Sequence, residues 1–222
     1  MAPHRPKSIT AGHDPIVVFD GAISVRQLTH PTRLFNLEVI FDDHHPHMLK
    51  LREQIPPQYF QYLQVEYVKV LEGSLYLDIG KKRVLLTPSD DEREIPTWTR
   101  NRAFPGPLSA ERRLTKFLLS GPAAAGTFML DTAFYENYYR YMDRALAPGG
   151  EGISIIQVLS MFDAGGSCLA LPRFIPFNMC ISRVMGVVVG RWLGGLLGYQ
   201  PYYKEWTTDW ETAKARKFFL QY

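Results

Sequence analysis

The chain has 222 residues, of which 46% are hydrophobic and 21% charged, so it has enough apolar material for a folded core and is not intrinsically disordered. Its formal charge is only +3, from 25 basic and 22 acidic residues spread along the sequence, which argues against a dedicated nucleic-acid binder. The two cysteines, Cys168 and Cys180, form neither a CxxC pair nor a secreted disulfide pattern, so we expect a cytoplasmic protein.

Residues 1–15 lack the apolar core of a signal peptide and contain early prolines, so we expect a flexible leader. Residues 16–122 contain short runs rich in Val, Ile, Phe and Tyr, separated by turn residues. These runs predict strands at 16–19, 33–41, 48–55, 66–73, 74–80 and 113–121. Many short strands with such punctuation are typical of a sandwich or barrel, so this part is predicted to be all-β.

Residues 123–222 have a different pattern, in which apolar residues recur at helical spacing. They predict helices at about 128–146, 153–162 and 177–198, followed by a tail of alternating aromatic and charged residues that folds back over the domain. The expected architecture is therefore mainly β with α: a single β-barrel with a C-terminal helical extension packed on it.

The third apolar segment, 177–198, raises the question of a membrane span. Arg191 interrupts it, and its uncharged runs are shorter than the roughly 20 residues that a span requires. We expect a packed helix in which Arg183 and Arg191 snorkel, with no transmembrane span. Peripheral membrane contact remains an open alternative.

The stretch from Pro56 to Phe104 resembles the two sequence motifs of a cupin barrel. Glu66 and Gly73 keep the spacing of the first motif, whose two histidine positions fall on Tyr59 and Gln61. In the second motif the histidine position falls on Asn101, while the family's other matching positions are Pro88, Ile95 and Pro96. The resemblance implies a jelly-roll-like cupin β-barrel over 16–122.

This departure from the cupin motifs bears on metal binding. Three imidazoles and a carboxylate bind iron, manganese, nickel or zinc, whereas a phenol and two amides are poor replacements. We therefore predict no metal and no other cofactor. A metal dioxygenase that uses substitute ligands is the alternative.

The resemblance extends into the second half of the chain, where segments such as FYENYYRYMDRAL and GYQPYYKEWTTDWE are similar to small fungal cupin-domain proteins of natural-product pathways. Several members of that group are metal-independent hetero-Diels-Alderases, which join an ortho-quinone methide of a tropolone or phenol to a terpene olefin. The resemblance implies a [4+2] cycloaddition, a hydrophobic small-molecule substrate and a homodimer. The alternatives are a dehydratase or isomerase acting on a polyketide or terpenoid intermediate, and a non-catalytic binding or assembly protein.

Glu66 is the foremost candidate for a catalytic residue. On a strand it shares a face with Val68 and Val70, and desolvation there would raise its pKa and suit it to general acid catalysis. Tyr59, Gln61 and Asn101 would complete a hydrogen-bonding cup for a substrate carbonyl or hydroxyl. The alternative is an inert polar network in a dead site, with Glu66 a relic carboxylate.

Three further residues are candidates for substrate binding. Trp98 and Phe104 would supply apolar walls for a flat ring, although aromatic residues near strand ends are more often core. Arg102 would face outward together with Arg100, unless a shift of register at Pro96 turns it toward an acidic substrate oxygen. All six histidines lie within the first 47 residues, and three of them, His44, His45 and His47, belong to the sequence FDDHHPH. Because Pro46 interrupts this cluster, we expect a solvated loop rather than a metal site.

Overall fold

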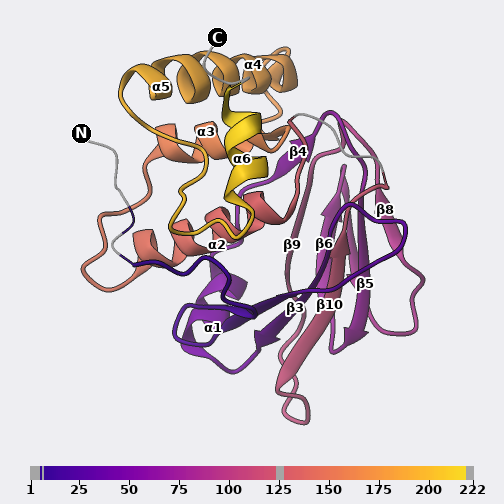
Figure 1. The fold of residues 1–222 in the computed structure, drawn as a ribbon. Coiled ribbons are helices and arrows are strands. Elements are labelled where there is room, and N and C mark those ends of the chain that lie inside the picture. Colours follow the sequence, from indigo (N-terminus) through magenta and orange to yellow (C-terminus); the bar gives the residue numbers. More distant parts are fainter. Residues whose placement is uncertain (1–5, 7, 124–127, 219–222) are drawn as a thin grey trace. The chain divides into compact units, whose positions relative to one another are not determined.

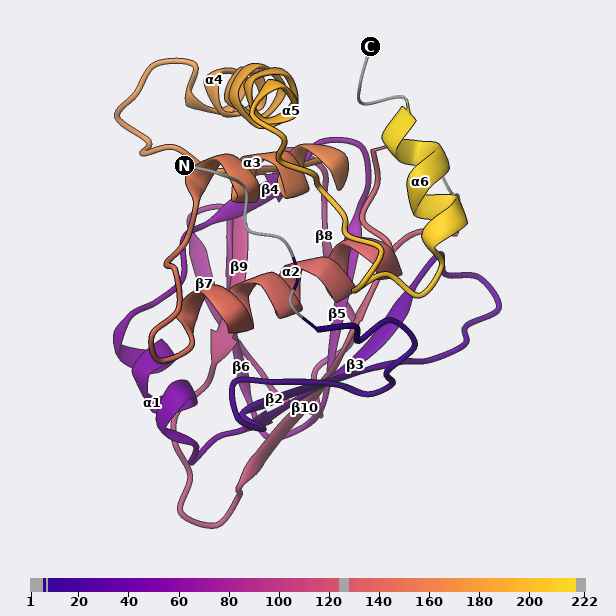
Figure 2. The same cartoon turned by 60° about the vertical axis from the view of Figure 1, so that its left-hand side comes forward.

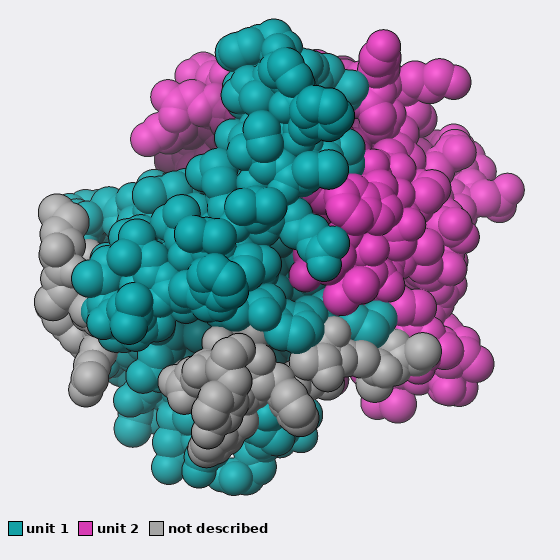
Figure 3. Space-filling model, turned by 90° about the horizontal axis from the view of Figure 1, so that it is seen from above, with its two compact units in different colours: residues 1–13, 126–222 teal, residues 14–125 magenta. Residues whose placement is uncertain are grey.

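A computed structural model of the chain describes residues 6, 8–123 and 128–218. The chain divides into two compact units (Figure 3), one formed by residues 14–125 and the other by residues 1–13 together with 126–222. Each unit has its own set of internal contacts.

Unit 14–125 is built from two antiparallel sheets (Figure 1). The first sheet has the strand order β1 (Ile16–Val18), β2 (Ile23–Gln27), β3 (Asn36–Asp42), β10 (Leu114–Ser120), β5 (Glu66–Glu72) and β8 (Arg93–Ile95). The second contains β4 (Tyr59–Gln61), β9 (Asn101–Pro105), β6 (Leu75–Ile79) and β7 (Lys82–Leu86) in that order. From β3 to β10 the chain passes back and forth between the two sheets, with the β6–β7 hairpin staying in one of them, as in a jelly roll. The predicted jelly-roll-like cupin barrel is confirmed.

The core of this unit lies between the inner faces of the strands. Buried side chains alternate with more exposed ones along β3, β5 and β10, because successive residues of a strand point to opposite faces. Inner positions are occupied by large apolar residues such as Val39, Val70 and Phe117. The same alternation puts Glu66 on the inner face of β5, in line with Val68 and Val70.

The turn between β5 and β6 requires glycine. Gly73 has a φ of +75°, which L side chains rarely adopt, and a Cβ atom there would lie 2.5 Å from the Thr115 hydroxyl oxygen. Both constraints favour the residue that the cupin motif places at this position.

The predicted strand 48–55 is wrong, because these residues belong to helix α1 (Pro46–Glu53). Proline is favoured at the first position of a helix, and the side chain of His45 caps this helix by accepting a hydrogen bond from the His47 backbone N–H. Arg52 then anchors the helix through Asp43, with 2.7 Å between guanidinium and carboxylate. The alternation of Met48, Lys50 and Arg52 with leucines resembled a strand, but the cap and the ion pair favour a helix.

Five strands described in this unit were not predicted: β2, β4, β7, β8 and β9. Each is only three to five residues long. Such segments contain too few apolar positions for an alternating pattern to be recognised. Their strand conformation depends on pairing with neighbours that are distant in sequence.

The other unit is helical, as predicted (Figure 2). It contains α2 (Thr132–Leu146), α3 (Ile155–Ala164), the short strand β11 (Ser167–Leu169), α4 (Asn178–Met185), the π-helical segment η1 (Gly186–Leu193), α5 (Gly194–Leu196) and α6 (Trp210–Phe218). Asp131 and Ser154 cap α2 and α3, each by accepting a hydrogen bond from a backbone N–H three residues further on. The segments α4, η1 and α5 form one continuous helix that runs beside α3.

The end of the predicted leader is hydrogen-bonded within this helical unit. The backbone N–H groups of Thr10 and Ala11 donate to the Glu205 carbonyl at 2.8 and 2.9 Å, and Arg140 donates to the Thr10 carbonyl at 2.8 Å. Residues 1–5 and 7 of that leader lie outside the described residues.

Candidate functional site

Three of the predicted catalytic side chains form a hydrogen-bonded chain inside the barrel unit. The amide nitrogen of Gln61, at the end of β4, donates to the Glu66 carboxylate at 2.6 Å. The amide nitrogen of Asn101, at the start of β9, donates to the Gln61 amide oxygen at 3.1 Å and to the Thr99 carbonyl at 3.2 Å. Asn101 thus donates to Gln61, and Gln61 donates to Glu66.

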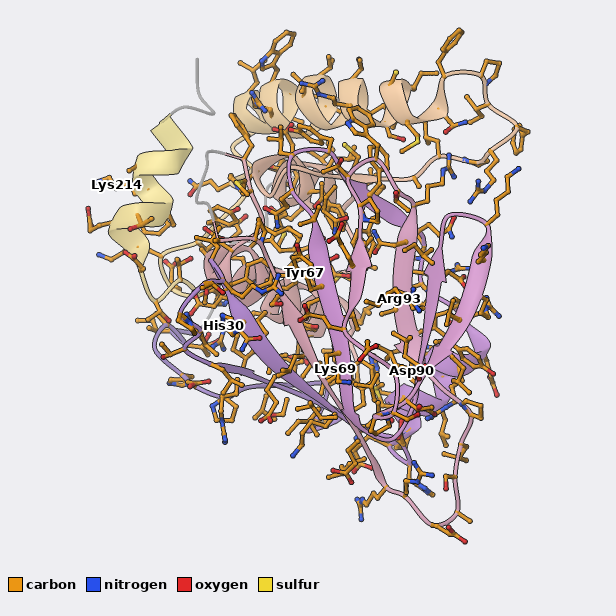
Figure 4. The ribbon with its side chains drawn as sticks, turned by 90° about the vertical axis from the view of Figure 1, so that its right-hand side faces the viewer. His30, Tyr67, Lys69, Asp90, Arg93 and Lys214 are labelled. Atoms are coloured by element: carbon orange, nitrogen blue, oxygen red, sulfur yellow. The ribbon has the colours of Figure 1, made fainter. Side chains whose placement is uncertain are left out.

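These three hydrogen-bonded side chains lie in the interior of the unit. Glu66, Gln61 and Asn101 each have 0% exposed surface, and Glu66 is directly opposite the buried Ile95 in the sheet. Figure 4 shows the other side of the strand, where Tyr67 and Lys69 lie on the outer surface. There the guanidinium carbon of Arg33 is 3.6 Å from the centre of the Tyr67 ring. Burial of a carboxyl group without hydrogen bonds is costly, and the hydrogen bond from Gln61 offsets part of that cost for Glu66.

Tyr59 completes the predicted set. It is the register partner of Asn101 in the β4–β9 pairing, and directly opposed residues of an antiparallel pair point to the same face. Tyr59 is only partly buried, unlike the other three. The structure therefore brings Tyr59, Gln61, Glu66 and Asn101 together, with Tyr59 at the more exposed edge.

Two buried amides of this unit, Asn101 and Gln64, have polar atoms without a hydrogen-bond partner among the described residues. They are the side-chain oxygen of Asn101 and both polar atoms of Gln64. Gln64 is 3% exposed and precedes Glu66 by two residues, with burial that alternates in phase with Glu66. The sequence reasoning did not select Gln64, and its only signal was this two-residue spacing. Buried polar atoms are almost always hydrogen-bonded, so these amides have capacity for water or a ligand.

Phe104 and Arg102 are not brought to Glu66. Phe104 is three residues from Asn101 along β9 and Arg102 is one, so both point to the opposite face, where they pair with Tyr76 and Asp78. Arg102 and Arg83 both bind the Asp78 carboxylate at 2.7 Å, and their hydrogen bonds hold the pKa of Asp78 below its ordinary value. The ring of Phe104 lies beneath Arg83, whose guanidinium carbon is 4.9 Å from the ring centre.

Trp98 contacts Gln61 through its backbone N–H and not through its ring. Its N–H donates to the Gln61 carbonyl at 2.7 Å, and its φ of +57° is rarely adopted by a bulky residue. The indole contacts the rings of Phe60 and Tyr62, at centroid distances of 5.6 and 6.0 Å, and is 43% exposed. Its position therefore flanks Gln61 without contacting Glu66.

The histidine cluster has structural contacts. His45 caps α1, the His44 ring nitrogen lies 3.0 Å from the Ser109 carbonyl oxygen, and the His47 ring stacks on Phe19 at 3.9 Å. Within the part of the chain that the structure describes, no group of three His, Cys, Asp or Glu side chains is arranged to hold a metal ion.

The residues at the cupin metal position do not fit the metal that this fold usually binds. That metal relies on neutral imidazole donors, but here the corresponding positions carry a phenol and two amides. In addition, Gln61 turns its N–H toward Glu66 and its oxygen toward Asn101, so both of its polar atoms are engaged within the protein. The set is suited to hydrogen bonding of an oxygen-containing organic molecule.

Comparison with curated proteins finds fungal relatives along nearly the whole chain. The probable oxidoreductase yanE of Aspergillus niger is 40% identical over 97% of this chain and 85% of its own length. The oxidoreductase macE of Penicillium terrestre is 43% identical over 86% of this chain and 75% of its own. The epoxidase atD of Aspergillus terreus is 34% identical over 97% of this chain and 70% of its own.

Two solved structures are similar to about half of this chain. KdgF from a Halomonas species is 17% identical with a TM-score of 0.33, over 53% of this chain and 94% of its own. An RmlC-like cupin from Shewanella frigidimarina is 12% identical with a TM-score of 0.31, over 54% of this chain and 94% of its own. No protein-family model matches the chain.

Proposed function

This chain belongs to the fungal family that includes yanE, macE and atD, and we propose that it is a metal-independent cupin enzyme of secondary metabolism. Its proposed reaction is a cyclisation, most concretely a hetero-Diels-Alder addition between an ortho-quinone methide, derived from a tropolone or phenol, and a terpene olefin. The observation that carries the proposal is the buried chain Asn101–Gln61–Glu66, which leaves one amide oxygen without a partner among the described residues.

The direction of the hydrogen bonds suggests how such a substrate would be held. The unpartnered oxygen of Asn101 can accept a hydrogen bond from a substrate hydroxyl group. Glu66, in its protonated form, would donate its proton to a hydroxyl on the carbon next to the ring, which leaves as water when its C–O bond breaks. The resulting Glu66 carboxylate would take up the proton of the adjacent phenolic hydroxyl, and the neutral quinone methide is the reactive diene. Tyr59 lies at the partly exposed edge and marks the side from which a ligand would reach Asn101. Access to the fully buried members requires movement of the residues that cover them.

The cycloaddition itself needs little proton transfer. Holding a diene and an olefin in a reactive arrangement can lower a barrier by roughly 7 to 11 kcal/mol through orientation alone. A hydrogen bond from Tyr59 to the oxygen of the heterodiene would withdraw electron density and assist further. In this proposal Glu66 acts before the ring closes, and the apolar environment determines which faces meet.

The test is a comparison of two conservative variants on the same strand. Glu66→Gln removes the proton-donating group and should lower turnover of a hydroxylated quinone-methide precursor by about 100-fold or more. Glu72→Gln alters an exposed carboxylate of β5 and should leave turnover unchanged. If Glu66→Gln produces the same rate and the same stereoisomer ratio as the unaltered protein, the assignment of the site is wrong.

The names of the relatives favour oxidation as a second candidate function. An oxidation would need an external oxidant, and its product would gain oxygen or lose hydrogen. The proposed dehydration would lose water, and the addition would combine two molecules. Product mass therefore separates the candidates. One tightly held transition-metal ion per chain after chelation would favour the oxidative one.

A further inference from the structure

The continuous helix Asn178–Leu196 has an exposed apolar face. Its outer side carries large hydrophobic side chains at intervals of one to four residues, namely Ile181, Val184, Val188, Trp192, Leu193 and Leu196. Immediately before it, Phe174 and Phe177 are 84% and 82% exposed. Contiguous apolar surfaces of this kind are uncommon on water-facing parts of a protein and mark interaction sites.

The opposite side of this helix is held against α3. Arg191 donates to both oxygens of Asp163, at 2.7 and 3.1 Å. Gly190 lies so close to α3 that a Cβ atom there would be 2.5 Å from the Leu159 carbonyl carbon. These contacts fix which face of the helix points outward, so the exposed apolar residues are a permanent feature of this unit.

Basic residues outnumber acidic ones around the helix. Residues 164–204 contain no Asp or Glu, and besides Arg191, which is paired with Asp163, they contain the basic residues Arg173, Arg183 and Lys204. Such a combination of an apolar face with nearby basic residues complements the surface of a bilayer that contains anionic lipids. A partner protein would have to match the basic residues of this segment with its own acidic residues, whereas an anionic bilayer offers negative charge and an apolar interior together.

Among the described residues, this helix is the one that is long and apolar enough to cross a membrane. Only 22% of its most apolar stretch of 18 residues is buried within the protein. Its packing on α3 through Gly190 and Arg191 means that lipid could not surround it on all sides. We propose that this face lies in the plane of an anionic membrane surface, inserting Phe177, Val188, Trp192 and their apolar neighbours between the lipids. The enzyme would then meet lipid-soluble substrates at the bilayer.

The first experiment is flotation of the full chain with vesicles of phosphatidylcholine alone or mixed with phosphatidylserine. The unaltered protein should float with both and more strongly with the mixed vesicles. The variant Val188→Asp/Leu193→Asp should lower the bound fraction at least about tenfold, because it places two charges on the inserted face. The control Leu71→Asp/Leu85→Asp should bind normally, since those leucines are exposed to the same degree, 42% and 41% against 42% and 42%, but lie on the strands β5 and β7.

Cys180 provides a second measurement. It is exposed at the start of the helix, whereas Cys168 is buried and its pKa is raised to about 12 by desolvation, so a thiol-reactive environment-sensitive dye at neutral pH would label Cys180. The dye emission should shift to the blue when mixed vesicles are added. Absence of flotation, equal flotation of the Val188→Asp/Leu193→Asp variant while circular dichroism shows it folded, or a dye shift that follows protein concentration without vesicles would overturn the proposal. The last result would indicate a second copy of the chain on this face.

Discussion

Gln64 and Asn101 are both buried amides in the barrel unit, but their hydrogen bonding differs. Asn101 donates to Gln61 and to the Thr99 carbonyl, and only its oxygen lacks a partner among the described residues. Gln64 has none for either polar atom within the same residues. The hydrogen bonds of Asn101 therefore stabilise the fold, whereas burial of the unpaired Gln64 amide costs free energy. Such an unpaired buried amide has capacity to bind a ligand.

We predict opposite effects of apolar substitution at these two sites. Gln64→Met should raise the free energy of unfolding by about 1 to 2 kcal/mol, because it removes two unpaired buried polar atoms. Asn101→Leu should lower it by about 1 to 3 kcal/mol, because it leaves the acceptors on Gln61 and Thr99 without their donor. Urea denaturation of both variants checks this. Destabilisation by Gln64→Met would mean that its amide is satisfied by water inside the protein.

At the scale of elements, the helix Asn178–Leu196 depends on where its glycines lie. Gly190 approaches the backbone of Leu159, while a Cβ atom on Gly195 would meet nothing within 4 Å. Glycine in a helix is unfavourable unless a close contact requires it. The two positions thus form a matched pair within one continuous helix.

Gly190→Ala should lower the free energy of unfolding of the helical unit by about 1 to 3 kcal/mol, because the new methyl group pushes the helix away from α3. Gly195→Ala should raise it by about 0.5 to 1 kcal/mol through helix propensity. Thermal unfolding followed by circular dichroism measures both. Equal effects of the two substitutions would show that α3 and the helix do not pack as described.

At the scale of the whole molecule, the two units contain acidic groups with opposite pKa shifts. In unit 14–125, hydrogen bonds from Arg83 and Arg102 lower the pKa of Asp78. In the helical unit, desolvation raises the pKa of Glu136 and of Asp163, although Thr208 and Arg191 partly oppose this. An acidic group whose pKa is lowered on folding stabilises the fold at pH values above its unfolded-state pKa. An acidic group whose pKa is raised on folding destabilises the fold at pH values above its folded-state pKa.

Acidification should therefore affect the units differently. The pKa values of Glu136 and Asp163 are raised above their ordinary values of 4.5 and 3.8. As the pH falls through this range, the two groups become protonated and their destabilising effect on the helical unit should disappear. The contribution of Asp78 should persist down to about 3.8 and be lost as the pH falls further through its lowered pKa. Hydrogen exchange resolved by segment should show this order, and Asp78→Asn should remove part of the acid sensitivity of unit 14–125. Acid loss of α2 and α3 before the barrel strands would contradict the prediction.

The sequence by itself determined the division into a β-rich first half and a helical second half, since these follow from short-range periodicity and turn residues. The resemblance of the sequence to the cupin motifs also implied that Tyr59, Gln61, Glu66 and Asn101 lie together, and the register and hydrogen bonds of the structure agree with this. A period of two fixes the face of Glu66 relative to Val68 without knowledge of any other strand.

Only the tertiary structure decided the remainder. The cap at His45 and the Arg52–Asp43 ion pair make 46–53 a helix despite strand-like alternation, and the register of β9 against β6 turns Arg102 and Phe104 toward Asp78 and Tyr76 instead of Glu66. Register between strands separated by more than twenty residues is set by packing and turn geometry, because a shift of one residue would exchange the two faces of the sheet at little local cost. The outward apolar face of 178–196 is likewise set by the contacts of Gly190 and Arg191 with α3, which the periodicity of the sequence does not predict.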